Sequence, residues 1–235
     1  MIDVSHVDLL CLDAGNTVIF LDHTRLASVL GVANVETVIR VEGEAKRLAE
    51  TGDLVDVDWS GRARPAAAGW GKMVGTIAHL SGTPRGEVGA LLDAAWAEHV
   101  KLNFWCKVPD GLGAALDAIR AKGTKVTIIS NSEGMLEALF HRLGIRQHFD
   151  SIVDSGLVGV EKPDPRIFDY ALEAFGAART HTLHLGDMFA TDILGARAAG
   201  VRSALIDPYG HYEGRHLDVP RVAGIIDVAR AILRA

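Results

Sequence analysis

Cysteine is scarce in this sequence, which contains only Cys11 and Cys106. The two residues share no spacing that is typical of a metal site, and both lie in apolar surroundings. This usage does not resemble a disulfide-built secreted domain, in which cysteines are frequent and paired. We therefore expect two buried, reduced thiols in a cytoplasmic protein.

Long apolar runs and basic blocks are also missing. No stretch approaches the roughly eighteen apolar residues that would span a bilayer. The first residues, 1–6, are not basic, and the apolar run after them is too short for a signal peptide. The 24 basic and 30 acidic residues give a net charge of −6. We therefore expect neither a membrane nor a nucleic acid as a partner.

The residues that are abundant favour a packed α/β protein. Almost half of the chain is apolar (49%), and aromatic side chains make up only 6%. This composition suits close-packed helices on a sheet. From Pro109 onwards, strand patterns alternate with helix patterns, which is typical of a parallel sheet. The predicted strands are 125–130, 151–153, 182–187 and 202–206, and the predicted helices are 110–122, 134–143, 163–175, one that ends near 199 and one that ends near 233.

A helical region separates the first predicted strand, Val7–Asp13, from these later strands. We expect one helix to start at Asn34 and another at Thr83-Pro84, while the segment 52–71 fits either a loop or a frayed helix. The second helix would place one apolar face on Val88, Leu91, Leu92, Ala95, Trp96 and Val100. The sequence thus predicts a Rossmann-like α/β core, residues 1–20 and 106–235, interrupted by a helical domain, residues 21–105.

Polar side chains lie where the predicted strands end. They are Asp13, Ser130, Lys162 after the third strand, and Asp187 with Asp192. The carboxyl ends of parallel strands meet at one edge of a sheet, so these groups should converge. Clustered carboxylates need a cation, and oxygen ligands suit Mg²⁺. Helix starts after Ser130 and Asp187 would favour an anion such as phosphate. Taken alone, Asp13 fits a turn residue that closes a strand equally well.

Four segments resemble the four sequence motifs of the haloacid dehalogenase (HAD) superfamily. They are 13–17 (Asp-Ala-Gly-Asn-Thr), 128–131 (Ile-Ile-Ser-Asn), 162–163 (Lys-Pro) and 186–192 (Gly-Asp-Met-Phe-Ala-Thr-Asp). They occur in the order of the family, and the resemblance covers essentially the whole chain. The helical region between the first two motifs resembles the helical cap of the C1-type subgroup.

The resemblance implies a role for each motif residue in phosphoryl transfer with Mg²⁺. Asp13 would be the nucleophile, and Lys162 would neutralise charge between it and the phosphoryl group. The metal would be held by Asp13, the main-chain carbonyl of Gly15, Asp187 and Asp192, the last directly or through water and Lys162. The phosphoryl oxygens would be held by Thr17, Ser130 and Asn131. The substrate would be a small phosphorylated metabolite, and we expect a monomer or a homodimer.

Gly15 departs from the pattern of the family's phosphatases. Those enzymes carry an Asp at this position, which protonates the leaving alcohol and then activates water. Gly15 has no side chain for this purpose, and general acid–base catalysis typically contributes about 10²–10⁴-fold. The rate of hydrolysis should fall most for alkyl phosphates. It should fall less for acyl and aryl phosphates, because their leaving groups have a low pKa.

The glycine leaves other activities open. A phosphonatase-like enzyme would use a lysine of the cap, for which Lys46, Lys72 and Lys101 are available. A 2-haloacid dehalogenase would attack carbon and bind a carboxylate through an arginine such as Arg40 or Arg47. A protein that binds phosphorylated metabolites without turnover is a non-enzymatic alternative.

His184 is a further polar residue within a predicted strand. We interpret it as a packed core histidine rather than as a ligand.

Overall fold

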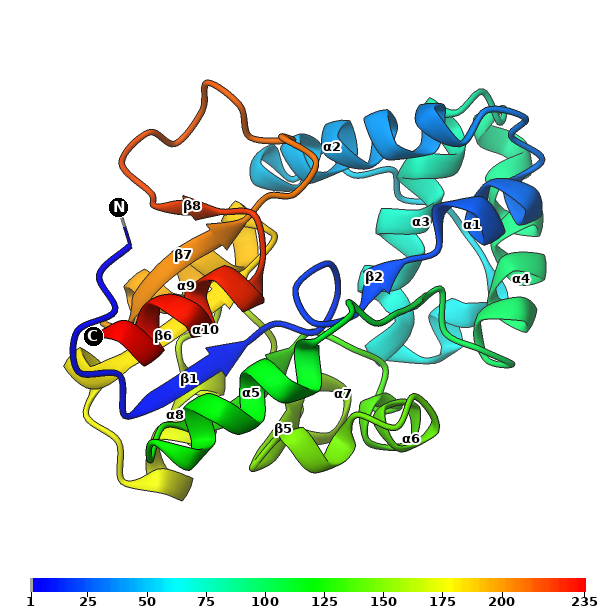
Figure 1. Cartoon of the computed structure of the whole chain (residues 1–235). Helices are drawn as coiled ribbons and strands as arrows, with labels where there is room; N and C mark the ends of the chain where they lie inside the picture. Colours follow the sequence, from blue (N-terminus) through cyan, green and yellow to red (C-terminus); the bar gives the residue numbers. More distant parts are fainter. Residues whose placement is uncertain (1) are drawn as a thin grey trace. The chain divides into compact units, whose positions relative to one another are not determined.

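The chain forms two compact units in a computed structural model that describes residues 2–235 (Figure 1). The α/β unit comprises residues 2–20 and 107–235, and the helical unit comprises residues 21–106. A short two-stranded sheet joins β2 (Phe20–Leu21) and β3 (Trp105–Lys107). The two segments that connect the units are therefore paired with each other.

The α/β unit is built on a six-stranded sheet with the order β5-β4-β1-β6-β7-β8. All of its neighbouring strands run parallel. The strands are β1 (Leu9–Leu12), β4 (Lys125–Ser130), β5 (Ser151–Asp154), β6 (Thr182–Gly186), β7 (Arg202–Ile206) and β8 (Arg221–Val222). This architecture confirms the predicted α/β fold with a parallel sheet. It also places β1 in the interior of the sheet, between β4 and β6.

Helices follow the strands of this unit. They are α5 (Leu112–Ala121), α6 (Leu136–Arg142), α7 (Ser155–Val158), α8 (Arg166–Phe175), α9 (Leu194–Ala198) and α10 (Ile225–Arg234). The predicted inward positions of α5, Leu112, Leu116 and Ile119, are buried. The helix predicted after Asp187 is not continuous, because residues Phe189–Ile193 form a π-helical turn before α9.

The apolar side chains of β1 form the centre of the core. All four residues of the strand are buried, as expected for a parallel strand that is covered on both faces. Leu9 and Cys11 pack with residues of α8 and α9 on one face, and Leu10 and Leu12 alternate to the other. The prediction of two buried thiols is confirmed for Cys11. It is wrong for Cys106, which is only half-buried because it lies in the short ribbon strand β3.

The helical unit contains four α-helices with their own apolar core. They are α1 (His23–Leu30), α2 (Val35–Thr51), α3 (Ala68–Leu80) and α4 (Val88–His99). Asn34 caps α2 as predicted, because its side chain accepts a hydrogen bond from the Glu36 amide at 3.0 Å. The segment 52–71, for which the sequence allowed either a loop or a frayed helix, is mostly irregular. It contains short 3₁₀ turns at Ser60–Ala63 and Pro65–Ala67 before α3.

The start of α4 differs from the prediction. Pro84 has an extended ψ of 139°, and a 3₁₀ turn, Arg85–Glu87, precedes the helix. Gly86 lies within that turn, and glycine is unfavourable in the interior of an α-helix. Val100 was predicted on the apolar face but is 47% exposed, because α4 ends one residue earlier at His99.

Within residues 2–235, no helix has both the length and the apolar character needed to cross a bilayer.

Leu10→Ala tests the packing of the central strand. Leu10 is fully buried, so the substitution should lower the free energy of unfolding by about 2–5 kcal/mol. Urea unfolding followed by circular dichroism measures this change, and Leu217→Ala is the matched control because Leu217 is 80% exposed. Equal stability of the two variants would contradict the assignment of β1 to the core.

Candidate active site

Asp13 is the first residue after β1, and its side chain is contacted by groups from two other segments. The Ser130 hydroxyl, at the end of β4, donates to Oδ1 of Asp13 at 2.9 Å. The Lys162 ammonium donates to the same oxygen at 2.7 Å. The Asp13 amide donates to the Leu185 carbonyl of β6 at 2.8 Å, which fixes the main chain at this point. The predicted convergence at the sheet edge therefore holds for Asp13, Ser130 and Lys162.

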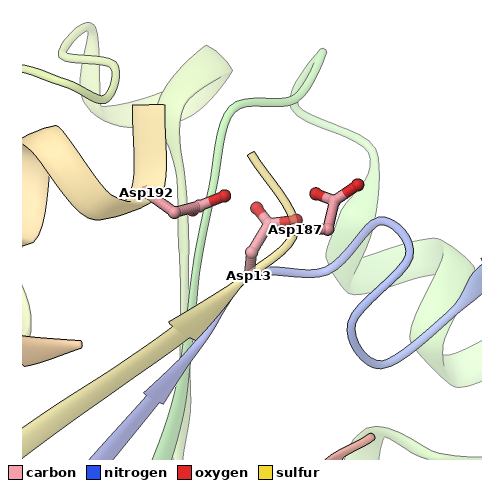
Figure 2. Close-up of side chains that lie close together, drawn as sticks. All are labelled: Asp13, Asp187 and Asp192. Carbon is pink, nitrogen blue, oxygen red and sulfur yellow. The ribbon is translucent and has the colours of Figure 1, made fainter. Parts of the chain in front are cut away.

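Two more carboxylates complete a cluster at the same edge. Asp187 follows β6 directly, and Asp192 lies in the π-helical turn. Each of the three aspartates is buried and offers an oxygen that lies within 4.8 Å of an oxygen from each of the others. Figure 2 shows Asp13, Asp187 and Asp192 gathered where the neighbouring strands end. The sequence thus correctly predicted which carboxylates meet.

Lys162 lies between two of these carboxylates. Its ammonium donates to Asp13 at 2.7 Å and to Oδ1 of Asp192 at 2.6 Å, and the residue is 2% exposed. Burial alone would lower the pKa of Lys162, but the two carboxylates hold it above its usual value. Burial would raise the pKa of Asp192, but Lys162 and His184 hold it well below its usual range. Lys162 and Asp192 are therefore a charged pair.

Asp13 has the opposite tendency. Burial raises the pKa of its carboxyl to about 6, and the Asp192 and Asp187 carboxylates act in the same direction, while Lys162 opposes them. With all three aspartates ionised, three negative charges face the one positive charge of Lys162. Among these four side chains, the negative charges then exceed the positive charge by two, in a buried place. A divalent cation with oxygen ligands fits this donor set.

The side chain of Asn131 holds the main chain of Lys162. Its Nδ2 donates to the Lys162 carbonyl at 2.8 Å, and its Oδ1 accepts from the Lys162 amide at 2.7 Å. The side chain therefore lies on the segment that presents Lys162, because the loop after β4 and the loop before α8 run together at this edge. The expectation that Asn131 holds a phosphoryl oxygen stays a prediction.

The loop after Asp13 contains a buried hydroxyl without a partner. Asn16 has a positive φ of 50°, and its Nδ2 donates to Oδ2 of Asp187 at 3.1 Å. The loop closes through the Asn16 amide, which donates to the Ile19 carbonyl at 2.7 Å. Thr17 is fully buried, and within the described part of the chain its Oγ1 has no hydrogen-bond partner. Buried hydroxyls are normally paired, so this donor is available to a ligand.

His184 is a part of the site that the sequence analysis missed. It is a buried core histidine, as expected, but its Nε2 also lies 2.9 Å from Oδ1 of Asp192. Burial lowers the pKa of His184. Gly186 is the sequence feature that could have indicated this contact, because positions 184 and 186 lie on the same face of β6. A Cβ at Gly186 would lie 2.1 Å from Cγ of Asp192, so the glycine leaves room for that carboxylate.

The cationic side chains proposed for the cap lie in the helical unit. Lys46 is buried, with its Nζ 3.7 Å from Oε1 of Glu42. Glu42 also contacts Nε2 of His23 at 2.8 Å. Lys101 is exposed and pairs with Glu98 at 2.5 Å. The remaining candidates are exposed or partly exposed: Lys72, Arg40 and Arg47. None of these contacts favours one of the alternative activities.

Comparison with curated proteins gives relatives that overlap this chain in part. Haloacid dehalogenase-like hydrolase domain-containing protein 3 of Mus musculus is 32% identical over 137 residues, 58% of this chain and 55% of that protein. The pyrimidine 5′-nucleotidase YjjG of Escherichia coli is 39% identical over 106 residues, 44% of this chain and 47% of that protein. The chain thus spans about half the length of the curated relatives that it matches.

A solved structure and a family model extend the comparison over most of the chain. The structure of YfnB from Bacillus subtilis, bound to magnesium, superposes with a TM-score of 0.68 at 16% identity. The superposition covers 98% of this chain and 100% of the YfnB chain. At 16% identity, this similarity shows the fold alone. The model of the haloacid dehalogenase-like hydrolases matches residues 7–200. The chain therefore belongs to the haloacid dehalogenase-like hydrolase family.

Proposed function

We propose that this hydrolase is a Mg²⁺-dependent phosphohydrolase that acts on a small phosphorylated metabolite through an aspartyl-phosphate on Asp13. One observation carries the proposal: the Asp13 carboxylate is held between the Lys162 ammonium and the Ser130 hydroxyl, beside two further carboxylates. A carboxylate nucleophile next to a cation suits attack on a phosphoryl group. A relative named as a nucleotidase supports the same class of reaction.

The two units have different roles in this proposal. Residues 1–20 and 106–235 are the HAD-like core, which contains every site residue discussed above. Residues 21–105 are a helical cap of the C1 type, which supplies substrate specificity. The division of the chain into two compact units, one of them residues 21–106, supports this assignment.

The metal is assigned to Asp13, Asp187 and the main-chain carbonyl of Gly15. Asp192 acts indirectly, because its oxygens already accept hydrogen bonds from Lys162, His184 and the Met188 amide. Bound Mg²⁺ would offset the excess negative charge and stabilise charge on the phosphoryl oxygens.

The reaction has two displacement steps. In the first, an Asp13 oxygen forms a bond to phosphorus while the bond from phosphorus to the leaving oxygen breaks. In the second, water attacks phosphorus, releases phosphate and restores the carboxylate. Lys162, Ser130 and the unpartnered hydroxyl of Thr17 are the donors for the phosphoryl oxygens. The Asn131 side chain positions Lys162, and the family resemblance implies that Asn131 also holds a phosphoryl oxygen.

Gly15 determines which substrates react fastest. No side chain at this position protonates the leaving oxygen, so that proton comes from solvent or from the substrate itself. A leaving group of low pKa departs without this help. We therefore assign acyl and aryl phosphates, rather than simple alkyl phosphates, as the preferred class.

Asp13→Asn tests the nucleophile. The wild-type protein should release phosphate from acetyl phosphate and p-nitrophenyl phosphate only when Mg²⁺ is present. The substitution should lower this rate on the order of 10³-fold or more, as removal of a nucleophile does. Asp227→Asn, on the exposed side of α10, is the control and should retain the wild-type rate. Wild-type turnover by Asp13→Asn would refute the proposal.

Gly15→Asp tests the missing proton donor. A carboxyl at this position should raise the rate for alkyl phosphates more than the rate for acetyl phosphate, by up to about 10²–10⁴-fold. The measurement is the ratio of kcat/KM for glycerol phosphate to that for acetyl phosphate. An unchanged ratio would mean that another group already supplies the proton.

The pH dependence of Mg²⁺ binding tests the metal site. The folded-state pKa of Asp13 is about 6, above the ordinary value of 3.8, so its contribution to stability is lost as pH rises through about 6. Mg²⁺ binds the ionised carboxylate and competes with the proton. The rise in Tm on adding Mg²⁺ should therefore be small near pH ~5 and larger near pH ~7.5, and Asp13→Asn should abolish the difference. An equal rise at both pH values would contradict this assignment.

A further inference from the structure

His184 is a buried polar residue for which the proposed reaction has no direct use. It lies in the middle of β6 with no exposed surface. Its Nε2 lies 2.9 Å from Oδ1 of Asp192, and within the described residues its Nδ1 has no hydrogen-bond partner. An apolar side chain would fill the same space without a buried, unpaired nitrogen. The imidazole therefore interacts with the site through its Nε2.

The partner of Nε2 determines which nitrogen carries the proton. The Asp192 carboxylate can only accept a hydrogen bond, so the neutral ring carries its proton on Nε2 and donates it. Phe168 packs edge-on against the ring, with 5.1 Å between the ring centroids, and restricts its orientation. His184 thus presents one fixed donor to Asp192.

Three donors together fix the Asp192 carboxylate. Oδ1 accepts from His184 and from the Lys162 ammonium, and Oδ2 accepts from the Met188 amide at 2.9 Å. Gly186 leaves the space that the carboxylate occupies. Of the three donors, only Lys162 also contacts Asp13. Lys162 thus bridges Asp192 and the proposed nucleophile.

We propose that His184 is a positioning residue that acts through Asp192 on Lys162. Its N–H holds the carboxylate in the one orientation that keeps the Lys162 ammonium against Asp13. The effect on turnover rests on the proposed function, whereas the hydrogen bond itself does not. Removal of outer partners of this kind typically costs about 10–100-fold in activity.

The first experiment observes the hydrogen bond in the wild-type protein. In NMR spectra of protein labelled with ¹⁵N-histidine, His184 should be the neutral Nε2–H tautomer, with a ring proton that exchanges slowly with water. Asp192→Asn should shift this resonance or abolish it. The Nδ1–H tautomer, or a rapidly exchanging proton, would overturn the proposal without any measurement of activity.

The second experiment compares two substitutions at the same position. His184→Leu removes the donor and should lower kcat for acetyl phosphate about 10–100-fold with little change in KM. His184→Gln retains an N–H at a similar distance and should retain most of the wild-type kcat. Equal losses in the two variants, or full activity of His184→Leu, would show that the residue only packs.

Cys11→Ala is the packing control. Cys11 is buried in β1 and is directly paired in register with His184. The variant should lose stability but not kcat, and a matching loss of kcat would assign the effect of His184→Leu to packing. If the wild-type protein hydrolyses none of the phosphorylated substrates, the proposed function fails. The NMR result then tests the hydrogen bond from His184 to Asp192 by itself.

Discussion

The ion pair between Lys162 and the carboxylates of Asp13 and Asp192 is the interaction on which this site depends. All three side chains are almost completely removed from water. Breaking a buried pair by removing one partner costs about 3–5 kcal/mol, because the other charge stays buried. The Lys162 ammonium therefore stabilises the two buried carboxylates, and these carboxylates hold the ammonium against Asp13. The third carboxylate, Asp187, leaves an excess of negative charge that a cation would offset.

The parallel sheet makes this arrangement possible. Asp13 follows an interior strand, β1, whose neighbours β4 and β6 deliver Ser130 and Asp187 to the same edge. The core beneath is largely apolar, and the charged groups of the site lie beyond the strand ends. Positions without a side chain matter as much as the charged groups. Gly186 gives Asp192 its space, and in our proposal Gly15 limits the leaving groups that the enzyme accepts.

Much of the fold was predictable because the strands are short apolar runs between turn residues. The strands 125–130 and 202–206 have the predicted bounds. The convergence of the aspartates followed from one rule about the carboxyl edge of parallel sheets. The start of α4 was mispredicted, because the local pattern at Thr83-Pro84 does not reveal the 3₁₀ turn that delays the helix.

The sequence predicted which residues form the site better than it predicted the contacts among them. Asn131 holds Lys162 across 31 residues, and this pairing depends on how two loops run beside each other. His184 was correctly expected in the core, but its hydrogen bond to Asp192 depends on a π-helical turn that no hydrophobic period indicates. A sequence pattern shows which face a residue occupies. It does not show the direction of a side chain within a network.

The proposed reaction requires that Asp13 becomes covalently phosphorylated. Rapid acid quenching of the protein during turnover of acetyl phosphate, followed by mass spectrometry of its peptides, detects such a phosphoryl group. We expect one added phosphoryl group on the peptide that contains Asp13, present only while substrate is being consumed. Turnover with an unmodified Asp13, or with the phosphoryl group on another residue, would contradict it.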